Sequence, residues 1–179
     1  MATGLLLVMF GDCTTSSEEF MGLDKEYRGT VQLGKTTDSD DLDGNVIAES
    51  PVNWNERAIE HAVMSFVGDI SQRPPSVSAI KVGGKRSYKQ ARKGVAVEHA
   101  SRPVVISEIQ IVELDNPFVT LNVRCGKGTY IRSIARDLGA ALGCGGTLAA
   151  LRRTAIGPYR VAHAWQISEA LKHPEFSGR

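Results

Sequence analysis

The sequence lacks the features that mark several large classes of protein. No apolar run reaches the ~18 residues of a transmembrane helix, and the apolar N-terminus has no basic region of the kind that begins a signal peptide. The three cysteines, Cys13, Cys125 and Cys144, are an odd number without CxxC spacing, which argues against a disulfide scaffold and favours a reducing compartment. We therefore expect one soluble, cytoplasmic domain.

The motifs of common enzyme chemistry are also missing. The sequence contains no GxSxG, Walker A or GxGxxG motif, so hydrolase, kinase and dehydrogenase functions have no support. None of the four histidines has a His or Cys partner at metal-ligand spacing. We therefore expect no metal site.

The acidic loop, residues 38–44 with the sequence DSDDLDG, does not fit a calcium site. An EF-hand loop starting at Asp38 would need Asp at position 5 and Gly at position 6, where this chain has Leu42 and Asp43. A solvated acidic turn is predicted instead. An alternative stays open in which carboxylates of this acidic half serve an aspartic-type hydrolase, the candidates being Asp38, Asp40, Asp41 and Asp43.

Charge is distributed unevenly along the chain. Residues 1–72 contain 4 Lys/Arg and 13 Asp/Glu, whereas residues 73–160 contain 15 Lys/Arg and 5 Asp/Glu. A basic block of this size indicates a surface that faces a polyanion. The alternative is that the two halves pair electrostatically within one fold.

Hydrophobic periodicity predicts strands with a few helices between them, which is an α+β domain. The predicted strands are Leu5–Phe10, Tyr27–Leu33 and a hairpin of Val104–Leu114 with Phe118–Cys125. The predicted helices are one capped by Asn53, then Ser87–Lys93, Tyr130–Leu142, and Leu148–Arg153 behind a cap at Thr147.

A run of basic residues without any acid indicates contact with RNA. Cationic side chains neutralise phosphates, and an aromatic among them can stack on a base. The run consists of Lys81, Lys85, Arg86, Lys89, Arg92 and Lys93, with Tyr88 between them. An ordinary solvated helix face is the alternative.

The junction from Lys127 to Arg132 joins a predicted strand to a helix. Tyr130 and Arg132 fall in the first helical turn, where main-chain N–H groups favour anions, and Arg132 can hold a carboxylate or a phosphate with two hydrogen bonds. The alternative is a core Tyr130 and a surface pair between Arg132 and Asp137. Spacing alone does not separate the two interpretations.

The sequence resembles the TruB-type tRNA pseudouridine synthases along nearly its whole length and in the correct order. The segments that carry the resemblance are ATGLL at 2–6, DKEYRGTVQLGKTTDSDDLDG at 24–44, PPSVSAIKVGGKRSYKQARKG at 74–94, RPVVISEIQI at 102–111 and the run 127–153. The resemblance implies a mixed, mainly antiparallel sheet with flanking helices, and isomerisation of uridine in the T-arm of tRNA without a cofactor. The base is flipped out of the RNA stack for this chemistry.

The resemblance also assigns roles to residues of this chain. Tyr27 matches the tyrosine that stacks on the flipped base, Arg132 the arginine that pairs with the catalytic aspartate, and Leu151 an apolar pocket residue; Tyr130 lies in the same motif as Arg132. Lys81 and the basic run after it are expected along the RNA. Three further basic residues join this predicted RNA-binding set: Lys127, Arg152 and Arg153.

The family's nucleophilic aspartate lies in a motif of the form GTLDPLATG. Ala2, Thr3 and Gly4 match its last three residues, so the aspartate is expected two residues before Met1, and the family's first strand and helix and its C-terminal PUA-type domain are expected to lie outside residues 1–179. We hypothesise that Met1 is a wrongly assigned start and that the native protein is a complete synthase. The alternative is a genuine short form that binds RNA without catalysis or has acquired another activity.

Overall fold

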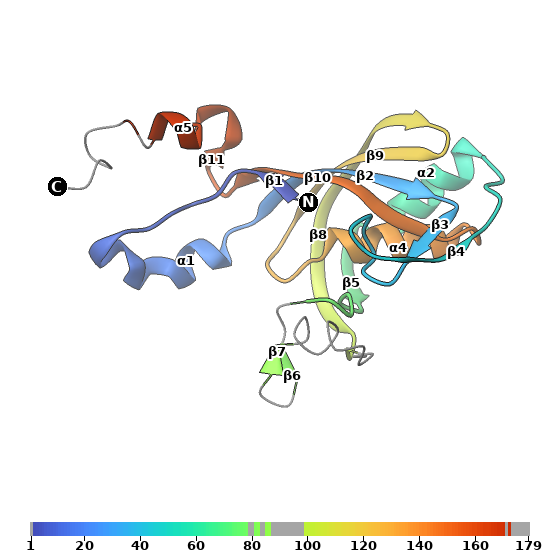
Figure 1. Cartoon of the computed structure of the whole chain (residues 1–179), viewed down its shortest axis with the longest axis horizontal. Coiled ribbons are helices and arrows are strands. Elements are labelled where there is room, and N and C mark those ends of the chain that lie inside the picture. The colour runs from blue at the N-terminus through green and yellow to red at the C-terminus, as the bar shows by residue number, and fades with distance from the viewer. Residues whose placement is uncertain (1, 79–80, 83–84, 87–98, 171, 173–179) are drawn as a thin grey trace.

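The protein is built on one central sheet, seen in the computed structural model of Figure 1, which describes residues 2–78, 81–82, 85–86, 99–170 and 172. The strands are β1 (Ala2–Gly4), β2 (Lys25–Leu33), β3 (Lys35–Thr37), β4 (Val46–Glu49), β5 (Gly68–Gln72), β6 (Lys81–Val82), β7 (Lys85–Arg86), β8 (Arg102–Asp115), β9 (Phe118–Cys125), β10 (Gly146–Ile156) and β11 (Tyr159–Arg160). The α-helices are α1 (Ser17–Gly22), α2 (Glu56–Met64), α4 (Ile131–Ala141) and α5 (Ile167–Ala170), and two 3₁₀ helices span Gly11–Ser16 and Val161–His163.

The central sheet has the order β1-β10-β2-β9-β8-β5, with β11 paired to β10. β1 runs parallel to β10, and the other neighbours are antiparallel. The chain thus has the predicted α+β fold with a mixed, mainly antiparallel sheet. β3 with β4 and β6 with β7 form two separate hairpins.

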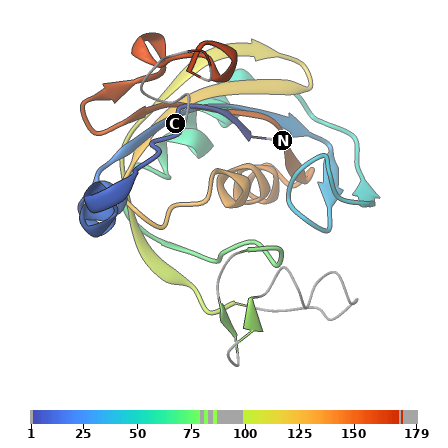
Figure 2. The same cartoon turned by 60° about the vertical axis from the view of Figure 1, so that its left-hand side comes forward.

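The hydrophobic core lies between the helices α2 and α4 and one face of this sheet (Figure 2). We call this face of the sheet the front face. Alternate residues of β2 and β9 point into the core, as the period of two requires, with Val31 and Val119 among the most buried. α4 contributes Ile134 and Leu138, both almost fully buried. The opposite, back face exposes polar residues.

Two of the predicted elements are wrong. Leu5–Phe10 is not a buried strand: β1 ends at Gly4, the segment has no strand partner among the described residues, and Leu6, Val8 and Phe10 are exposed. Leu148–Arg153 is not a helix but the middle of β10, which lies between β1 and β2 and is fixed by their ladders. Its Leu and Ala residues favour a helix locally, and tertiary pairing overrides this preference.

Other boundaries differ by small amounts or lie outside the description. Asn55 rather than Asn53 caps α2, because its side chain accepts from the Ala58 N–H at 3.1 Å. The hairpin of β8 and β9 and the helix α4 confirm the predictions, with Tyr130 as the α4 cap. The predicted helix Ser87–Lys93 lies outside the described residues.

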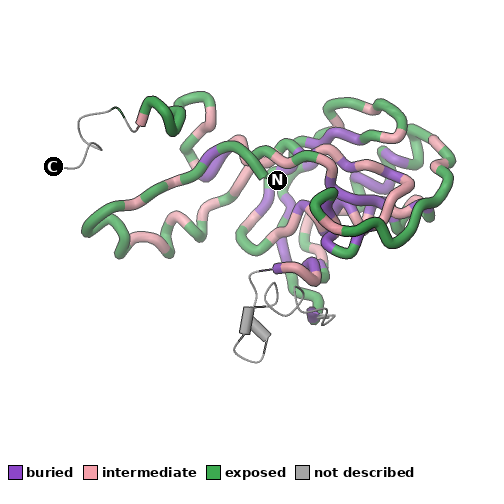
Figure 3. The backbone as a smooth tube through the Cα atoms, in the orientation of Figure 1, coloured by how far each residue is buried: buried purple, intermediate pink, exposed green. Residues whose placement is uncertain are grey.

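The N-terminal and C-terminal segments extend from the body as an arm (Figures 1 and 3). In this arm α1 lies against β11, with the Phe20 and Tyr159 rings 6.0 Å apart between centroids. Lys25 donates from Nζ to the carbonyls of Met21 and Leu23 at the end of α1. The arm exposes apolar side chains and buries few residues, so the folded body is carried by the sheet and its two covering helices.

Candidate functional site

The start of α4 is fixed by a buried glutamine. Gln72, which is 2% exposed, accepts a hydrogen bond from the Tyr130 N–H at 2.8 Å and donates to the Tyr130 carbonyl at 3.2 Å. This amide therefore pairs with both backbone groups of the cap residue, which has extended dihedrals and makes no cap with its own side chain. Gln72 thus sets where the helix carrying Arg132 begins.

Arg132 lies in the first turn of α4 and bridges two distant segments. Its Nη1 donates to the Ser39 carbonyl at 2.9 Å and to Asp41 Oδ2 at 3.1 Å, and its Nη2 donates to the Val77 carbonyl at 2.7 Å. The surface pair with Asp137 is therefore wrong, because Asp137 pairs with Arg136. A guanidinium held in this way offers fixed positive charge beside the sheet.

The acidic loop is the predicted solvated turn only in part, because Asp38 and Asp43 are exposed while the middle of the loop turns inward. Asp41 is a buried residue whose carboxylate also accepts from the Ser39 hydroxyl at 2.6 Å and from the Asp43 N–H at 3.2 Å. The loop also pairs with β10, since the Leu148 N–H donates to the Asp40 carbonyl at 3.0 Å and the Leu42 N–H to the Leu148 carbonyl at 3.2 Å. Charge attraction to α4 and this backbone pairing together draw the loop inward.

Tyr27 and Leu151 share the front face with the start of α4. Tyr27 and Gly29, two residues apart on β2, lie on the same face of the sheet, and Leu151 is the cross-strand partner of Gly29. A Cβ on Gly29 would lie 3.2 Å from Ile131 Cγ2 and 3.6 Å from Leu151 Cδ1, so the missing side chain lets helix and strands approach closely. The residue next to Arg132 thus packs beside the predicted pocket residue.

Arg153 lies beside Tyr27 as its cross-strand partner. Burial raises the pKa of the Tyr27 hydroxyl, and the hydrogen bond with Arg153 opposes this shift. Arg153 also donates from Nε to the Leu5 carbonyl at 2.8 Å, which ties the N-terminal segment to β10. Tyr27 is therefore a neutral, half-buried aromatic ring at ordinary pH.

The predicted RNA-binding residues do not form one surface. Lys127 is exposed just before α4, Arg153 is on the front face, and Arg152 is exposed on the back face opposite Arg28. For Lys81, Lys85 and Arg86 the structure describes the backbone alone, in the hairpin of β6 and β7. Tyr88, Lys89, Arg92 and Lys93 lie outside the described residues.

Part of the charge asymmetry is internal. Arg132 pairs with Asp41, Arg136 with Asp40, and Glu26 with both Arg124 and Arg160. Each of these pairs joins the acidic residues 1–72 to the basic residues 73–160. The interpretation of two halves that pair electrostatically thus holds for these residues, while the basic run 81–93 stays a separate prediction.

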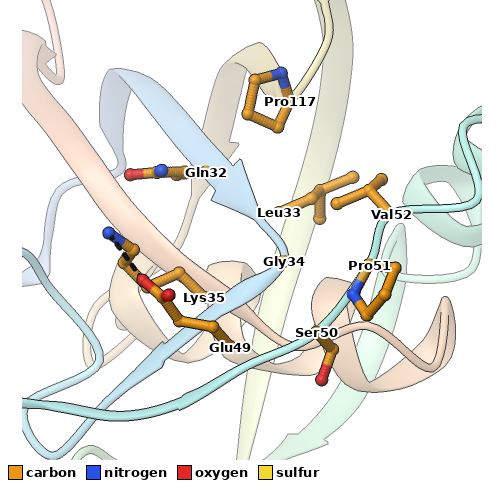
Figure 4. Close-up of a pocket in the computed structure, with 9 residues that line it drawn as sticks. All are labelled: Gln32, Leu33, Gly34, Lys35, Glu49, Ser50, Pro51, Val52 and Pro117. Atoms are coloured by element: carbon orange, nitrogen blue, oxygen red, sulfur yellow. Dashed lines mark ion pairs between the residues drawn. The ribbon is translucent and has the colours of Figure 1, made fainter.

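Two surface hollows lie away from Arg132. The first, about 440 Å³ and shown in Figure 4, is lined by residues of β2, β3 and the 49–52 segment, with the Lys35–Glu49 ion pair of 3.2 Å at its edge. The second, about 420 Å³, is a polar groove of the back face that includes Asn122 and Arg124. Tyr27 is among the residues that line the second hollow, and neither hollow is lined by Tyr130, Arg132 or Leu151.

Sequence reasoning missed Gln72 and the pairing of Asp41 with Arg132, since Asp41 was named only among the carboxylates of the hydrolase alternative. Asp41 is 91 residues from Arg132, and the one available signal was the complementary charge of the two halves. The sequence gave no indication of the role of Gln72, because a single Gln shortly before Pro74 and Pro75 is compatible with an ordinary loop. Within the described ranges no group of three metal-ligating side chains occurs, and no helix is long and apolar enough to span a membrane.

Comparison with known proteins defines the class of the chain. Residues 1–131 match the family described as TruB family pseudouridylate synthase (N terminal domain), and residues 132–173 match the tRNA pseudouridylate synthase B C-terminal domain. Fold and sequence together are those of a pseudouridylate synthase domain. The chain belongs to the TruB family.

Several relatives share the name tRNA pseudouridine synthase B. The chain is 47% identical to that of Opitutus terrae, covering 100% of this chain and 76% of the relative. It is 47% identical to that of an Azoarcus species, covering 96% and 57%, and 43% identical to that of Haemophilus influenzae, covering 94% and 54%. The chain thus spans little more than half of the latter two relatives.

Solved structures share the fold. A Cbf5-Nop10-Gar1 complex contains a chain with a TM-score of 0.64 and 28% identity, covering 89% of this chain and 38% of that one. A structure of an H/ACA RNP bound to a substrate RNA containing 2'-deoxyuridine gives a TM-score of 0.55 at 23% identity, covering 82% and 32%. The second likeness concerns the fold alone.

Proposed function

We propose that this protein isomerises uridine to pseudouridine in the T-arm of tRNA. The observation that carries the proposal is the placement of Tyr27 and Leu151 on the front face that the start of α4 covers, within a chain of the TruB family. The buried free cysteines Cys125 and Cys144 are consistent with a cytoplasmic location.

In this proposal each front-face residue has one task. The flipped uracil stacks on the Tyr27 ring, and Leu151 supplies an apolar wall. Arg132 presents its guanidinium to the nucleophilic carboxylate, and Tyr130 stays a site residue through its place at the α4 cap. Breaking the glycosidic bond and reattaching uracil through carbon needs no external electron carrier, so no cofactor is proposed.

The direction of β1 supports a nucleophile that approaches Arg132. β1 runs parallel to β10, with Ala2 opposite Leu151 and Gly4 opposite Arg153. Traced backward past Ala2, this direction leads along β10 toward Leu148, where the acidic loop pairs and Asp41 holds Arg132. In the proposed reaction Asp41 keeps this guanidinium in place for the nucleophilic carboxylate.

The acidic-loop carboxylates are a weaker basis for a hydrolase. Asp40 and Asp41 are each ion-paired with an arginine, and Asp38 accepts from Asn45 through both oxygens. Carboxylates engaged in this way suit positioning better than paired acid–base chemistry, in which one carboxyl must hold a proton near its partner.

We keep a single pseudouridine-synthase-like domain over residues 1–179 as a proposal, since β10 joins strands from both matched segments.

The proposal is tested by tritium release from tRNA labelled at uridine C5. The 179-residue chain is compared with a chimera that adds the N-terminal segment of the Opitutus terrae relative, and with the same chimera carrying Arg132→Met. We expect turnover by the chimera alone. Turnover by residues 1–179 would refute an upstream nucleophile, and a chimera that binds tRNA without turnover would favour the catalytically inactive alternative.

RNA binding is measured separately on the 179-residue chain. The basic block predicts tRNA binding whose affinity falls steeply with salt, with a slope of about −0.7 to −0.9 per phosphate neutralised on a log–log plot. Lys81→Ala and Lys85→Ala each should lower the slope by about one contact. An affinity equal at low and high salt would contradict the proposed RNA surface.

A further inference from the structure

A second arginine, Arg136, lies one helical turn after Arg132 on the same side of α4. It donates from Nη1 to Asp40 Oδ2 at 3.0 Å, from Nη2 to the Arg73 carbonyl at 2.8 Å and from Nε to Asp137 Oδ1 at 2.8 Å. Its three nitrogens are therefore all engaged. The partners belong to the acidic loop, to the segment after β5 and to α4 itself.

Arg132 and Arg136 bridge the same two segments. On one side they contact residues 39–41 of the acidic loop, and on the other they contact the carbonyls of Val77 and Arg73. The 73–77 segment is tied further by the Ser133 hydroxyl, which donates to the Arg73 carbonyl at 2.8 Å, and by the Ser76 hydroxyl, which donates to the Asp38 carbonyl at 2.9 Å. This segment leads toward the predicted RNA-binding run.

The backbone of Asp40 explains how two adjacent carboxylates reach one helix. Successive side chains of an extended strand point to opposite sides, so Asp40 and Asp41 would not both face α4 from an extended backbone. Asp40 has a φ of 60°, in the left-handed region, and both carboxylates contact α4 arginines. This conformation costs free energy in a residue other than glycine, although Asp tolerates it better than most.

The Asp40–Arg136 pair lies where burial disfavours charge. The two side chains are 12% and 16% exposed. Burial raises the pKa of the Asp40 carboxyl above its ordinary value even though Arg136 acts in the opposite direction. The charged carboxylate is thus less favoured in the folded protein than in the unfolded chain, so ionisation of Asp40 lowers the free energy of unfolding. A costly charge in a strained loop beside a site is typical of a functional constraint.

We propose that Asp40 and Arg136 are positioning residues that hold the acidic loop and the 73–77 segment on α4, and thereby fix the guanidinium of Arg132. The geometry that carries this inference is the shared bridging by the two arginines and the left-handed backbone at Asp40. The functional consequence rests on the proposed role of Arg132, and the structural part does not.

The structural part is tested on the free 179-residue chain by NMR of the arginine guanidinium groups. Asp40→Asn removes the charge while keeping a residue that tolerates positive φ. We expect the Arg132 Nη–H signals, which report the bonds to Ser39, Asp41 and Val77, to shift and their exchange with water to accelerate about tenfold as these bonds loosen. Asp38→Asn, in the same loop but bonded to Asn45, is the matched control and should leave the Arg132 signal unchanged.

Thermal unfolding checks that each variant keeps its fold. Asp40→Asn should lower the unfolding temperature less than Arg136→Met does, because Arg136 keeps Asp137 and the Arg73 carbonyl as partners, whereas the Asp40 carboxylate would lose its arginine. An Asp40→Asn protein with an unchanged Arg132 signal in an intact fold would overturn the inference.

The functional part is read in the chimera that carries the relative's N-terminal segment. Asp40→Asn should lower kcat about tenfold with KM within about twofold, since a misplaced catalytic group costs rate more than binding. If the chimera turns over and Asp40→Asn leaves kcat unchanged, the positioning role fails while the proposed function stands. If the unsubstituted chimera neither binds nor modifies tRNA, the proposed function fails, and the Arg132 signal still decides the structural part.

Discussion

The two faces of the central sheet carry similar ionic pairs in different surroundings. On the front face, the side chains of Arg132 and Asp41 are 22% and 13% exposed, and backbone carbonyls of two segments share the guanidinium. On the back face, the side chains of Arg124 and Glu26 are 47% and 29% exposed, and the pair joins two adjacent strands. The front pair organises distant parts of the chain, whereas the back pair lies on the surface of an existing ladder.

The contribution of an arginine–carboxylate pair to the fold therefore depends on its burial and on the other groups that the guanidinium binds. Solvent and salt weaken an exposed pair, so its loss changes stability little. A buried pair has lost its hydration, and removing one partner leaves the other charge without compensation. Substitutions should therefore have their greatest effect in the front-face core and a much smaller one at exposed pairs of the back face.

The largest effect is expected in the front-face core. Leu138→Ala removes a fully buried side chain of α4 and should lower the free energy of unfolding by about 2–5 kcal/mol, through lost transfer energy and a cavity. Val112→Ala, at a site 41% exposed on β8, is the control and should stay within about 0.5 kcal/mol. Urea denaturation measures both, and equal losses would show that the core is not on the front face.

The second effect compares the two ion pairs directly. Arg132→Met should lower the free energy of unfolding by about 3 kcal/mol, because Asp41 stays buried with its charge uncompensated. Arg124→Met should produce no change that denaturation can resolve, at low or at high salt. Similar losses in the two variants would contradict the distinction between the faces.

The third effect concerns the close contact between α4 and the start of β10. A Cβ on Gly139 would lie 2.0 Å from the Gly146 nitrogen, so Gly139→Ala should destabilise by about 1–3 kcal/mol, although Ala favours helices. The reciprocal control, Ala140→Gly, lies at an exposed site of the same helix and should cost about 1 kcal/mol by propensity alone. A Gly139→Ala protein more stable than wild type would contradict the prediction and show that the backbone at Gly146 moves to accept the methyl group.

The smallest effect is a pH dependence from a front-face thiol. Burial raises the pKa of Cys125 to about 11, so between roughly pH 9 and 11 the folded protein keeps a proton that the unfolded chain loses. Stability should therefore fall as pH rises, with a slope of up to about 1.4 kcal/mol per pH unit from this group. Cys125→Ala should flatten the fall and Cys13→Ala should not, as denaturation at pH 8, 9 and 10 would show.

The sequence alone predicts the parts of the fold that have strong local patterns. The alternation from Tyr27 to Leu33 and the helical spacing of Ile134 and Leu138 are visible without neighbours, and the structure confirms both. Leu148–Arg153 fails because helix-forming residues were placed in a strand by partners on both sides. Leu5–Phe10 fails because an apolar run forms a buried strand only where another strand pairs with it.

For the candidate site, the structure brings Tyr27 and Leu151 to the front face beside the start of α4, and the partners of the site residues are not visible in the sequence. Tyr27 and Leu151 lie in register positions that a strand pairing had to reveal. The partnership of Arg132 with Asp41 depends on a loop that folds back onto β10, which no local spacing encodes. The ion pair between Arg132 and Asp41 and the pairing of the loop with Leu148 thus fix the position of the acidic loop, which hydrophobic periodicity does not predict.

The parallel register along β10 sets the spacing of the site. β1 pairs with Leu151 to Arg153, and the acidic loop pairs with Leu148 in the same direction. A one-residue slip of β1 would move the entering chain by about 3.3 Å and reverse which side chains face the front. Deleting a single residue from Ala2–Gly4 would therefore change which side chains of β1 face the front, without changing any residue that contacts Arg132.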